Sequence, residues 1–76
     1  MQEVDFLTIF NNLPWNIKLQ VLRTMKQWKQ KEAAEKCGTV RRIYSNWETG
    51  KFKPLERNQK IITKVFGVNV FEEIHE

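Results

Sequence analysis

Cysteine and histidine are almost absent from this sequence, which has one of each among its 76 residues. Cys37 has no second cysteine for an intramolecular disulfide, which indicates a reducing cytoplasm. One cysteine and one histidine (His75) cannot supply the four ligands of a structural zinc site. No nucleophile–base pair, phosphate-cradling glycine loop or pair of carboxylates stands out either. We therefore expect no metal, no cofactor and no enzymatic activity.

Long apolar runs are also missing, since the longest extends over only a few residues. A membrane-spanning helix needs about 20 predominantly apolar residues. The chain starts Met-Gln-Glu-Val-Asp, which is acidic where a secretory signal requires a basic segment. The sequence thus predicts a cytoplasmic protein that neither crosses nor binds a membrane.

Acidic residues are scarce in the middle of the chain. All 13 Lys and Arg residues lie between Lys18 and Lys64, together with only four of the nine acids. Thirteen bases against four acids give that segment a net charge of +9, whereas the whole chain carries +4. A basic middle with acidic ends indicates a polyanionic partner such as nucleic acid. The alternative is that these charges only keep the surface soluble.

Turn signals divide the chain into helix-sized segments, and no segment alternates as a strand does. Apolar residues of the first segment share one broad helical face, and Pro14 suits the first turn of the next helix. We expect that apolar face to be covered, either by the domain itself or by a second copy. The predicted helices span residues 2–12, 14–27, 30–37, 40–49, 55–66 and 70–76.

The third and fourth segments have the features of two helices that cross closely. Ala33, Ala34 and Cys37 form a stripe of small residues, and Gly38 follows as a left-handed helix end. In the next segment, the predicted inner stripe consists of Val40, Tyr44 and Trp47, with Ile43 at its edge. The residues predicted to point outward are Arg42, Ser45, Asn46 and Thr49.

Several short motifs follow one another at a characteristic spacing. They are Leu22-Arg23, Gln30-Lys-Glu-Ala-Ala34-Glu-Lys-Cys-Gly38, Arg41-Arg42-Ile-Tyr-Ser-Asn46-Trp47-Glu48-Thr-Gly50-Lys51, Pro54 and Phe66-Gly67-Val68-Asn69-Val70-Phe71-Glu72-Glu73-Ile74. Through them the chain resembles the Cro and phage-repressor (XRE-like) type of helix-turn-helix DNA-binding domain. The resemblance covers about residues 17–74.

The resemblance implies one all-α domain over residues 1–76, a compact five-to-six-helix bundle of the lambda-repressor-like type. Residues 1–14 would form an extra N-terminal helix, residues 17–74 the DNA-binding core and residues 30–49 the helix-turn-helix itself. The helix over 40–49 would enter the major groove of DNA, which is wide enough to admit a helix.

Site roles follow from the same resemblance. Base-reading roles fall on Val40, Arg41, Arg42, Ser45 and Asn46, and phosphate-contacting roles on Lys29, Gln30, Lys51 and Lys53. An ion pair between Arg23 and Glu48 would tie the first family helix to the recognition helix. Alternatives remain: an arginine that only grips phosphate, a solvated Asn46, and Val40 or Ile43 as partly buried core.

Two departures from the family pattern affect the helix starts. Lys29 stands where the second family helix usually has a Ser or Thr cap, and Val40 replaces the usual polar cap of the recognition helix unless Thr39 takes that role. Phe71 replaces a residue that is usually polar. If exposed, it would join an interface with Ile74.

The expected function is that of a Cro-like protein or small repressor in a bacterium or phage. A homodimer would set two recognition helices about 34 Å apart on a palindromic operator. The alternative is a protein-interaction module, such as an antitoxin or an adaptor, that binds a protein partner through the N-terminal helix and binds DNA only secondarily.

Overall fold

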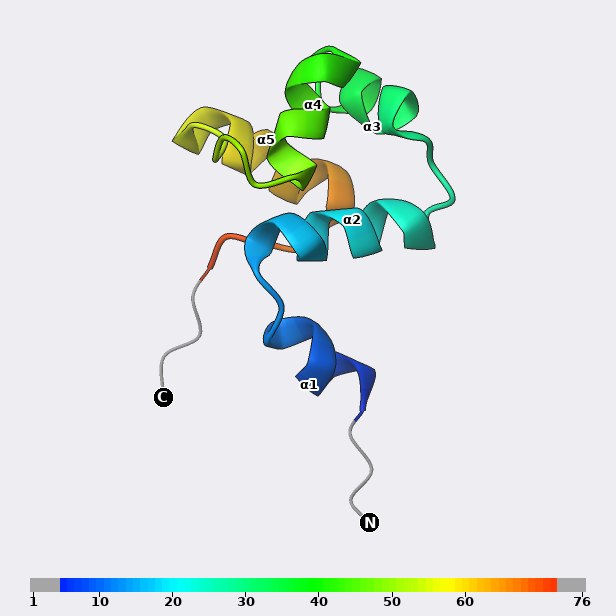
Figure 1. The fold of residues 1–76 in the computed structure, drawn as a ribbon, viewed down its shortest axis with the longest axis vertical. Helices are drawn as coiled ribbons and strands as arrows, with labels where there is room; N and C mark the ends of the chain where they lie inside the picture. Colours follow the sequence, from blue (N-terminus) through cyan, green and yellow to red (C-terminus); the bar gives the residue numbers. More distant parts are fainter. Residues whose placement is uncertain (1–4, 73–76) are drawn as a thin grey trace.

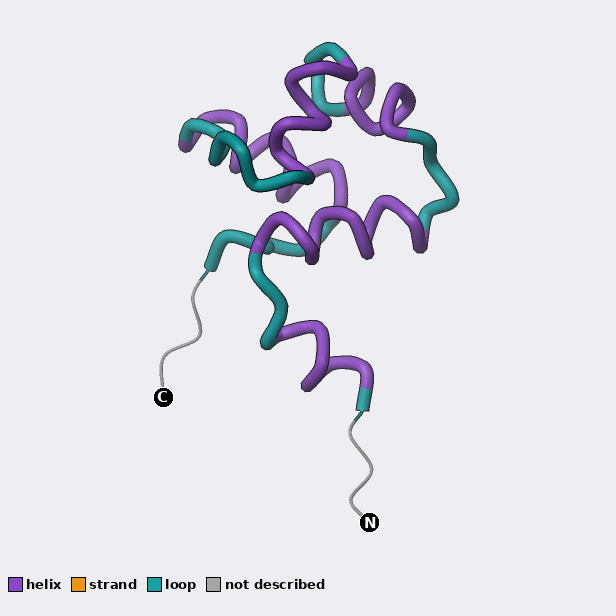
Figure 2. Tube along the Cα trace, in the orientation of Figure 1, coloured by secondary structure: helices purple, strands orange, loops and turns teal. Residues whose placement is uncertain are grey.

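The computed structural model describes residues 5–72, which contain five α-helices and no strand. The helices are α1 (Phe6–Asn11), α2 (Trp15–Met25), α3 (Gln30–Lys36), α4 (Arg41–Glu48) and α5 (Glu56–Phe66). Figure 1 shows α2 to α5 gathered into one bundle, with α1 standing apart below α2. Figure 2 shows the short loops that join the helices. The prediction of an all-α fold is confirmed.

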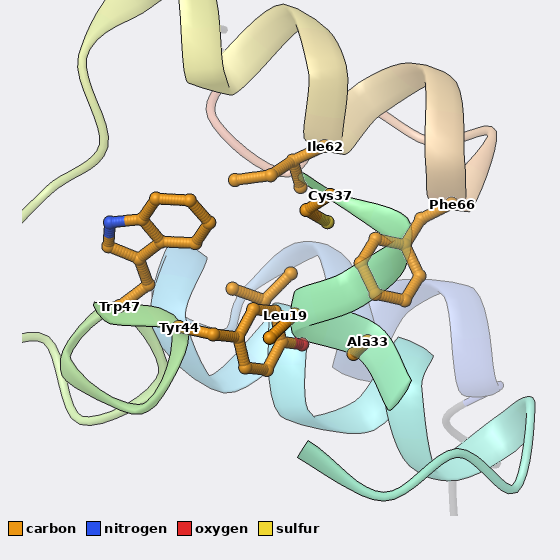
Figure 3. Close-up of a cluster of buried hydrophobic side chains, with 8 residues drawn as sticks. Leu19, Ala33, Cys37, Tyr44, Trp47, Ile62 and Phe66 are labelled. Atoms are coloured by element: carbon orange, nitrogen blue, oxygen red, sulfur yellow. The ribbon is translucent and has the colours of Figure 1, made fainter. Parts of the chain in front are cut away.

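The core lies where α2, α3, α4 and α5 meet. Figure 3 shows large side chains from α4 and α5 packed over small ones from α3. Ala33 and Ala34 are fully buried, so a larger side chain at either position would separate α3 from α4. The buried cluster consists of Leu19, Ala33, Ala34, Cys37, Tyr44, Trp47, Ile62 and Phe66.

The three tryptophans have packing roles. Trp47 is buried in the core, whereas Trp15 and Trp28 pack against its edge. The Trp28 ring lies 5.6 Å from the ring of Phe66, and Trp15 lies 5.6 Å from Phe71. Phe71 is half-buried by this contact and so is a packing residue of its own domain.

The turn between α3 and α4 is built on Gly38, whose φ is +73°. The Thr39 N–H donates to the Ala34 carbonyl at 2.9 Å, and the Gly38 N–H donates to the Glu35 carbonyl. Only glycine adopts this left-handed conformation at no steric cost. The turn therefore sets the crossing of α3 over α4.

The predicted sixth helix over residues 70–76 is wrong at its start. Val70 and Phe71 form a turn, because the Asn69 side chain accepts a hydrogen bond from the Phe71 N–H at 2.9 Å. Asn69 thus closes a local turn, where the sequence pattern predicts a helix cap. The last four residues of that prediction, and Ile74 with them, lie outside the described residues.

Helix α1 does not fold its apolar face onto the domain. Its N-cap, Asp5, accepts a hydrogen bond from the Thr8 N–H at 2.9 Å, which also lowers the pKa of that carboxyl group. Only Phe10 is buried, against Lys18, whose Nζ lies 5.6 Å from the ring centroid. The exposed apolar residues are Phe6 at 54%, Leu7 at 66% and Ile9 at 51%. The expectation that the domain itself covers this face is therefore wrong.

Burial raises the pKa of Cys37 from its ordinary value of 9.0 to about 11. The folded chain thus holds the thiol proton more tightly than the unfolded chain does. That stabilisation is complete below about pH 9 and disappears as the pH rises towards 11. We expect the free energy of unfolding to fall by about 1 kcal/mol between pH 8 and pH 10, measured by urea titration. Cys37→Ala should remove most of that pH dependence; an unchanged slope in this variant would contradict the assignment.

Candidate nucleic-acid interface

Helix α4 turns one side to the core and the other to solvent. Tyr44, Trp47 and Glu48 are buried, whereas Arg41 and Arg42 at its start are exposed. At 100° per residue, Arg42 lies roughly opposite the centre of the buried side, and the next turn places Asn46 and Thr49 beside it. Ser45 and Asn46 are half-buried. The outward row predicted from the sequence therefore exists as a row of polar side chains.

The predicted inner stripe is wrong at Val40, and Ile43, predicted at its edge, is exposed as well. Val40 is 57% exposed and Ile43 is 41% exposed, so neither belongs to the core. Val40 is the N-cap residue, with an extended backbone at φ −105° and ψ 158°, and its side chain does not follow the helical period. Glu48 takes the inner position instead, because polar partners meet its carboxylate there. Two apolar side chains are thus free beside the arginines.

Glu48 joins α4 to α2 and α3. Its carboxylate accepts hydrogen bonds from Arg23 Nε at 2.6 Å and Nη2 at 3.2 Å, and from Gln30 Nε2 at 3.1 Å. Arg23 Nη1 also donates to the Trp28 carbonyl at 2.9 Å. The hydrogen bonds to Glu48 raise the pKa of Arg23 further above its usual value. The Arg23–Glu48 ion pair is present and fixes the orientation of α4.

Two further residues hold the end of α4, and sequence reasoning missed both. Asn16 Nδ2 and Gln20 Nε2 donate to the backbone carbonyl of Glu48, at 3.1 Å and 2.8 Å. They occupy successive turns of α2 and continue the row that ends at Arg23. Three polar residues at helical spacing on one side of α2 are a signal visible in the sequence.

Tyr44 lies at the centre of the core with its hydroxyl group shielded from solvent. Burial holds the pKa of Tyr44 well above its usual range. Although Glu48 lies close to it, the hydroxyl has no hydrogen-bond partner in acceptable geometry among residues 5–72. An unsatisfied buried hydroxyl costs stability, whereas the ring itself contributes a large buried area.

Tyr44→Phe is therefore expected to leave the free energy of unfolding unchanged or raise it by up to about 1 kcal/mol. Tyr44→Ala, the matched control, should lower it by about 3–5 kcal/mol because the ring is lost as well. Urea denaturation followed by circular dichroism measures both. A loss above about 2 kcal/mol in Tyr44→Phe would mean that the hydroxyl is bonded.

The start of α3 lies beside the end of α4, because Gln30 reaches Glu48. One N–H of the Gln30 amide is used in that contact, and the second makes no hydrogen bond within residues 5–72. Lys29 is the N-cap and gives no side-chain cap; instead the Glu32 carboxylate accepts from the Lys29 N–H at 3.2 Å. Lys29 and Gln30, which the sequence predicts to contact phosphate, thus lie at the start of α3 and near the end of α4.

The loop after α4 folds back onto that same end. The N–H groups of Lys51 and Phe52 donate to the Asn46 carbonyl at 3.0 and 3.4 Å. Gly50 permits this turn with a φ of +78°, and an added Cβ would lie 3.2 Å from the Asn16 amide. Lys51 and Lys53 are exposed, with an exposed Phe52 between them. Lysines therefore flank the end of α4, and arginines occupy its start.

Comparison with known proteins identifies the family. The family model described as helix-turn-helix matches residues 19–72. The HTH-type transcriptional activator BcrR of Enterococcus faecalis is 40% identical over 60 residues, which cover 79% of this chain and 29% of that protein. The chain thus spans less than a third of that relative's length. No solved structure matches the chain.

These matches confirm the resemblance on which the site residues rest. The matched residues include all of α3, α4 and the turn on Gly38. Among residues 5–72, no helix is long and apolar enough to cross a membrane. The chain belongs to the XRE-type helix-turn-helix family of DNA-binding proteins.

Proposed function

We propose that this chain is a sequence-specific transcription regulator that places α4 in the major groove of an operator. The observation that carries the proposal is the outward polar row of α4 on a helix anchored by Tyr44, Trp47 and Glu48. A recognition helix needs both features, because its reading side chains must be free while its axis is fixed.

Arginines at the start of α4 are suited to guanine. A guanidinium group donates two parallel hydrogen bonds to guanine O6 and N7, and Arg42 points directly outward. Arg41 lies more to the side and reads a neighbouring base or a phosphate. The Asn46 amide matches adenine N6 and N7, and Ser45 donates to either kind of base.

The exposed apolar residues beside the arginines suit thymine. Val40 and Ile43 are free to contact a thymine methyl group, which is the apolar feature of the major groove. The operator should therefore contain guanine, with thymine and adenine close to it. The proposal thus predicts which bases the half-site contains, and this prediction can be tested.

Phosphate contacts would come from both sides of α4. Lys29 caps α3, Gln30 is its first residue, Lys51 and Lys53 follow α4, and all but the half-buried Gln30 are exposed. The three lysine charges and the Gln30 amide would bind the DNA backbone without reading sequence. Each neutralised phosphate releases counterions, so affinity should fall steeply as salt increases.

We further propose that a homodimer reads a palindromic operator and that occupancy of the operator is the regulatory act. Two copies would place their recognition helices about one DNA turn, ~34 Å, apart. A dimer bound over a promoter excludes other proteins from that DNA and so represses. The relative in Enterococcus faecalis is named an activator, so the position of the operator would decide the sign.

Selection of bound sites from random double-stranded DNA tests the proposal. We expect a palindrome whose half-sites contain guanine and are separated by about 10 base pairs, centre to centre. A reporter gene whose promoter carries that site, either over or upstream of the transcription start, then shows whether the chain represses or activates. Recovery of no preferred sequence, with binding of random DNA alone, would reject sequence-specific recognition.

A further inference from the structure

We propose that the exposed face of α1 is a docking surface for a second copy of this chain, seated in a hollow on that copy's α2. The proposal deepens the proposed function by naming the contact that makes the homodimer. It concerns a surface away from α4, so it stands or falls on measurements made without DNA.

The first half of the contact is the apolar face of α1. Phe6, Leu7 and Ile9 are each more than half exposed, while Phe10 alone holds the helix to its own chain. Phe6 stacks on Phe10 with ring centroids 5.7 Å apart, which gives the face a defined shape. Apolar residues clustered on a helix of six residues need a partner in water.

The second half is the side of α2 that faces away from the core. Ile17, Val21 and Met25 follow one another at four-residue spacing and form one apolar stripe. With Gln20 and Thr24 they line a hollow of about 280 Å³. Met25 is 62% exposed, and Ile17 and Val21 are half-buried. The hollow can therefore accept apolar side chains that protrude from another helix.

The chain's own α1 does not fill this hollow. None of the residues that line the hollow belongs to α1, whose buried Phe10 contacts Lys18 instead. One chain thus carries an unused apolar projection and an unused apolar hollow. Two copies related by a two-fold axis satisfy both, since each α1 enters the hollow of the other.

Charge favours a second copy as the occupant. Asp5 caps helix α1, which contains no basic residue, whereas α2 contains no acid and is followed directly after Met25 by the exposed Lys26. An acid at the start of α1 and a lysine at the end of the α2 stripe have opposite charges, which favours their pairing between two copies. On most other faces, the net charge of +9 on residues 18–64 opposes self-association.

The position of α1 leaves the DNA-binding side free. In Figure 1, α1 lies at the opposite end of the long axis from α3 and α4. A dimer formed through α1 and α2 therefore does not cover Arg42 or the lysines that flank α4. The contact is small, so the expected dissociation constant is in the micromolar range, as for weak specific complexes, about 10⁻⁶ M.

Sedimentation of the full chain without DNA, over a wide concentration range, tests the proposal. The wild-type chain should form a reversible dimer. Leu7→Lys and Met25→Glu should each weaken dimerisation by about 100-fold, because each change occurs twice in a symmetric contact and each loss is about tenfold. Both side chains are more than 60% exposed, so folding, checked by circular dichroism, should be preserved. Leu55→Lys is the matched control, since Leu55 is 68% exposed but lies before α5.

An equimolar mixture of Leu7→Lys and Met25→Glu separates this geometry from others. In the mixed dimer one contact is native and the other pairs the new lysine with the new glutamate, so dimerisation should recover. Arg42→Ala should dimerise as the wild type does, and its loss of specific binding reports on the proposed function alone. A monomeric wild type, a dimer that Leu55→Lys dissociates, or a mixture that stays monomeric would overturn the proposal. So would a wild-type chain that assembles only with a different protein.

Discussion

Glu48→Ala should lower the free energy of unfolding by about 3–5 kcal/mol, which is the usual effect of removing one partner of a buried ion pair. The substitution removes the acceptor of three hydrogen bonds and leaves the Arg23 guanidinium, which is largely shielded, without its counter-charge. Gln30 loses its partner too. A domain of this size has a stability near the lower end of about 5–15 kcal/mol, so the variant should be substantially unfolded at physiological temperature.

Chemical denaturation followed by tryptophan fluorescence measures the loss. Glu56→Ala is the matched control, since Glu56 is 85% exposed and lies 3.9 Å from Lys60 in the other ion pair of the described residues. Its effect should stay within about 0.5 kcal/mol. A double variant, Arg23→Met with Glu48→Met, should regain much of the stability because no charge is left stranded. A loss below about 1 kcal/mol in Glu48→Ala would show that the pair contributes little.

Periodicity predicts most of the bundle because a helix in a small domain must bury one face. Tyr44 and Trp47 are buried one turn apart, and the small residues Ala33 and Ala34 lie under α4, as their spacing indicates. The start of α3 at Gln30 is also as predicted, although Lys29 caps it poorly. Glycines in the left-handed conformation end the helices, as Gly38 does after α3. Local rules suffice where the sequence itself specifies the face and the end.

The failures occur where the outcome depends on what lies opposite a residue. Val40 and Ile43 have the apolar character of core residues, but both are exposed. Arg23 of α2 and Gln30 of α3 donate hydrogen bonds to Glu48, so the side of α4 that carries Glu48 faces the core. Helix α1 has an amphipathic pattern whose partner the sequence does not specify. At Val70, the Asn69 side chain bonds locally and prevents a helix from starting. A helical wheel contains no information on any of these neighbours.

The exposure of Arg42 opposite a buried stripe gives the largest expected effect on DNA binding. Arg42→Ala removes a guanidinium group that, in the proposed complex, donates two hydrogen bonds to one guanine. Binding to the selected operator should weaken by about 1–3 kcal/mol, roughly 5- to 150-fold. Binding to random DNA should change little, because side chains that grip phosphate supply that affinity. The variant therefore loses its preference among sites more than its grip on DNA.

Lys51→Ala is the matched control, because Lys51 follows α4 and is proposed to contact phosphate. It should weaken operator and random DNA alike and reduce the slope of log affinity against log salt by about 1. Competition titrations at several salt concentrations separate the two patterns. Folding is not at issue, since both side chains are exposed and make none of the contacts that hold α4. If Arg42→Ala lowered the affinity for operator and random DNA by the same factor, Arg42 would be a phosphate contact, and the polar row of α4 would not be the reading surface.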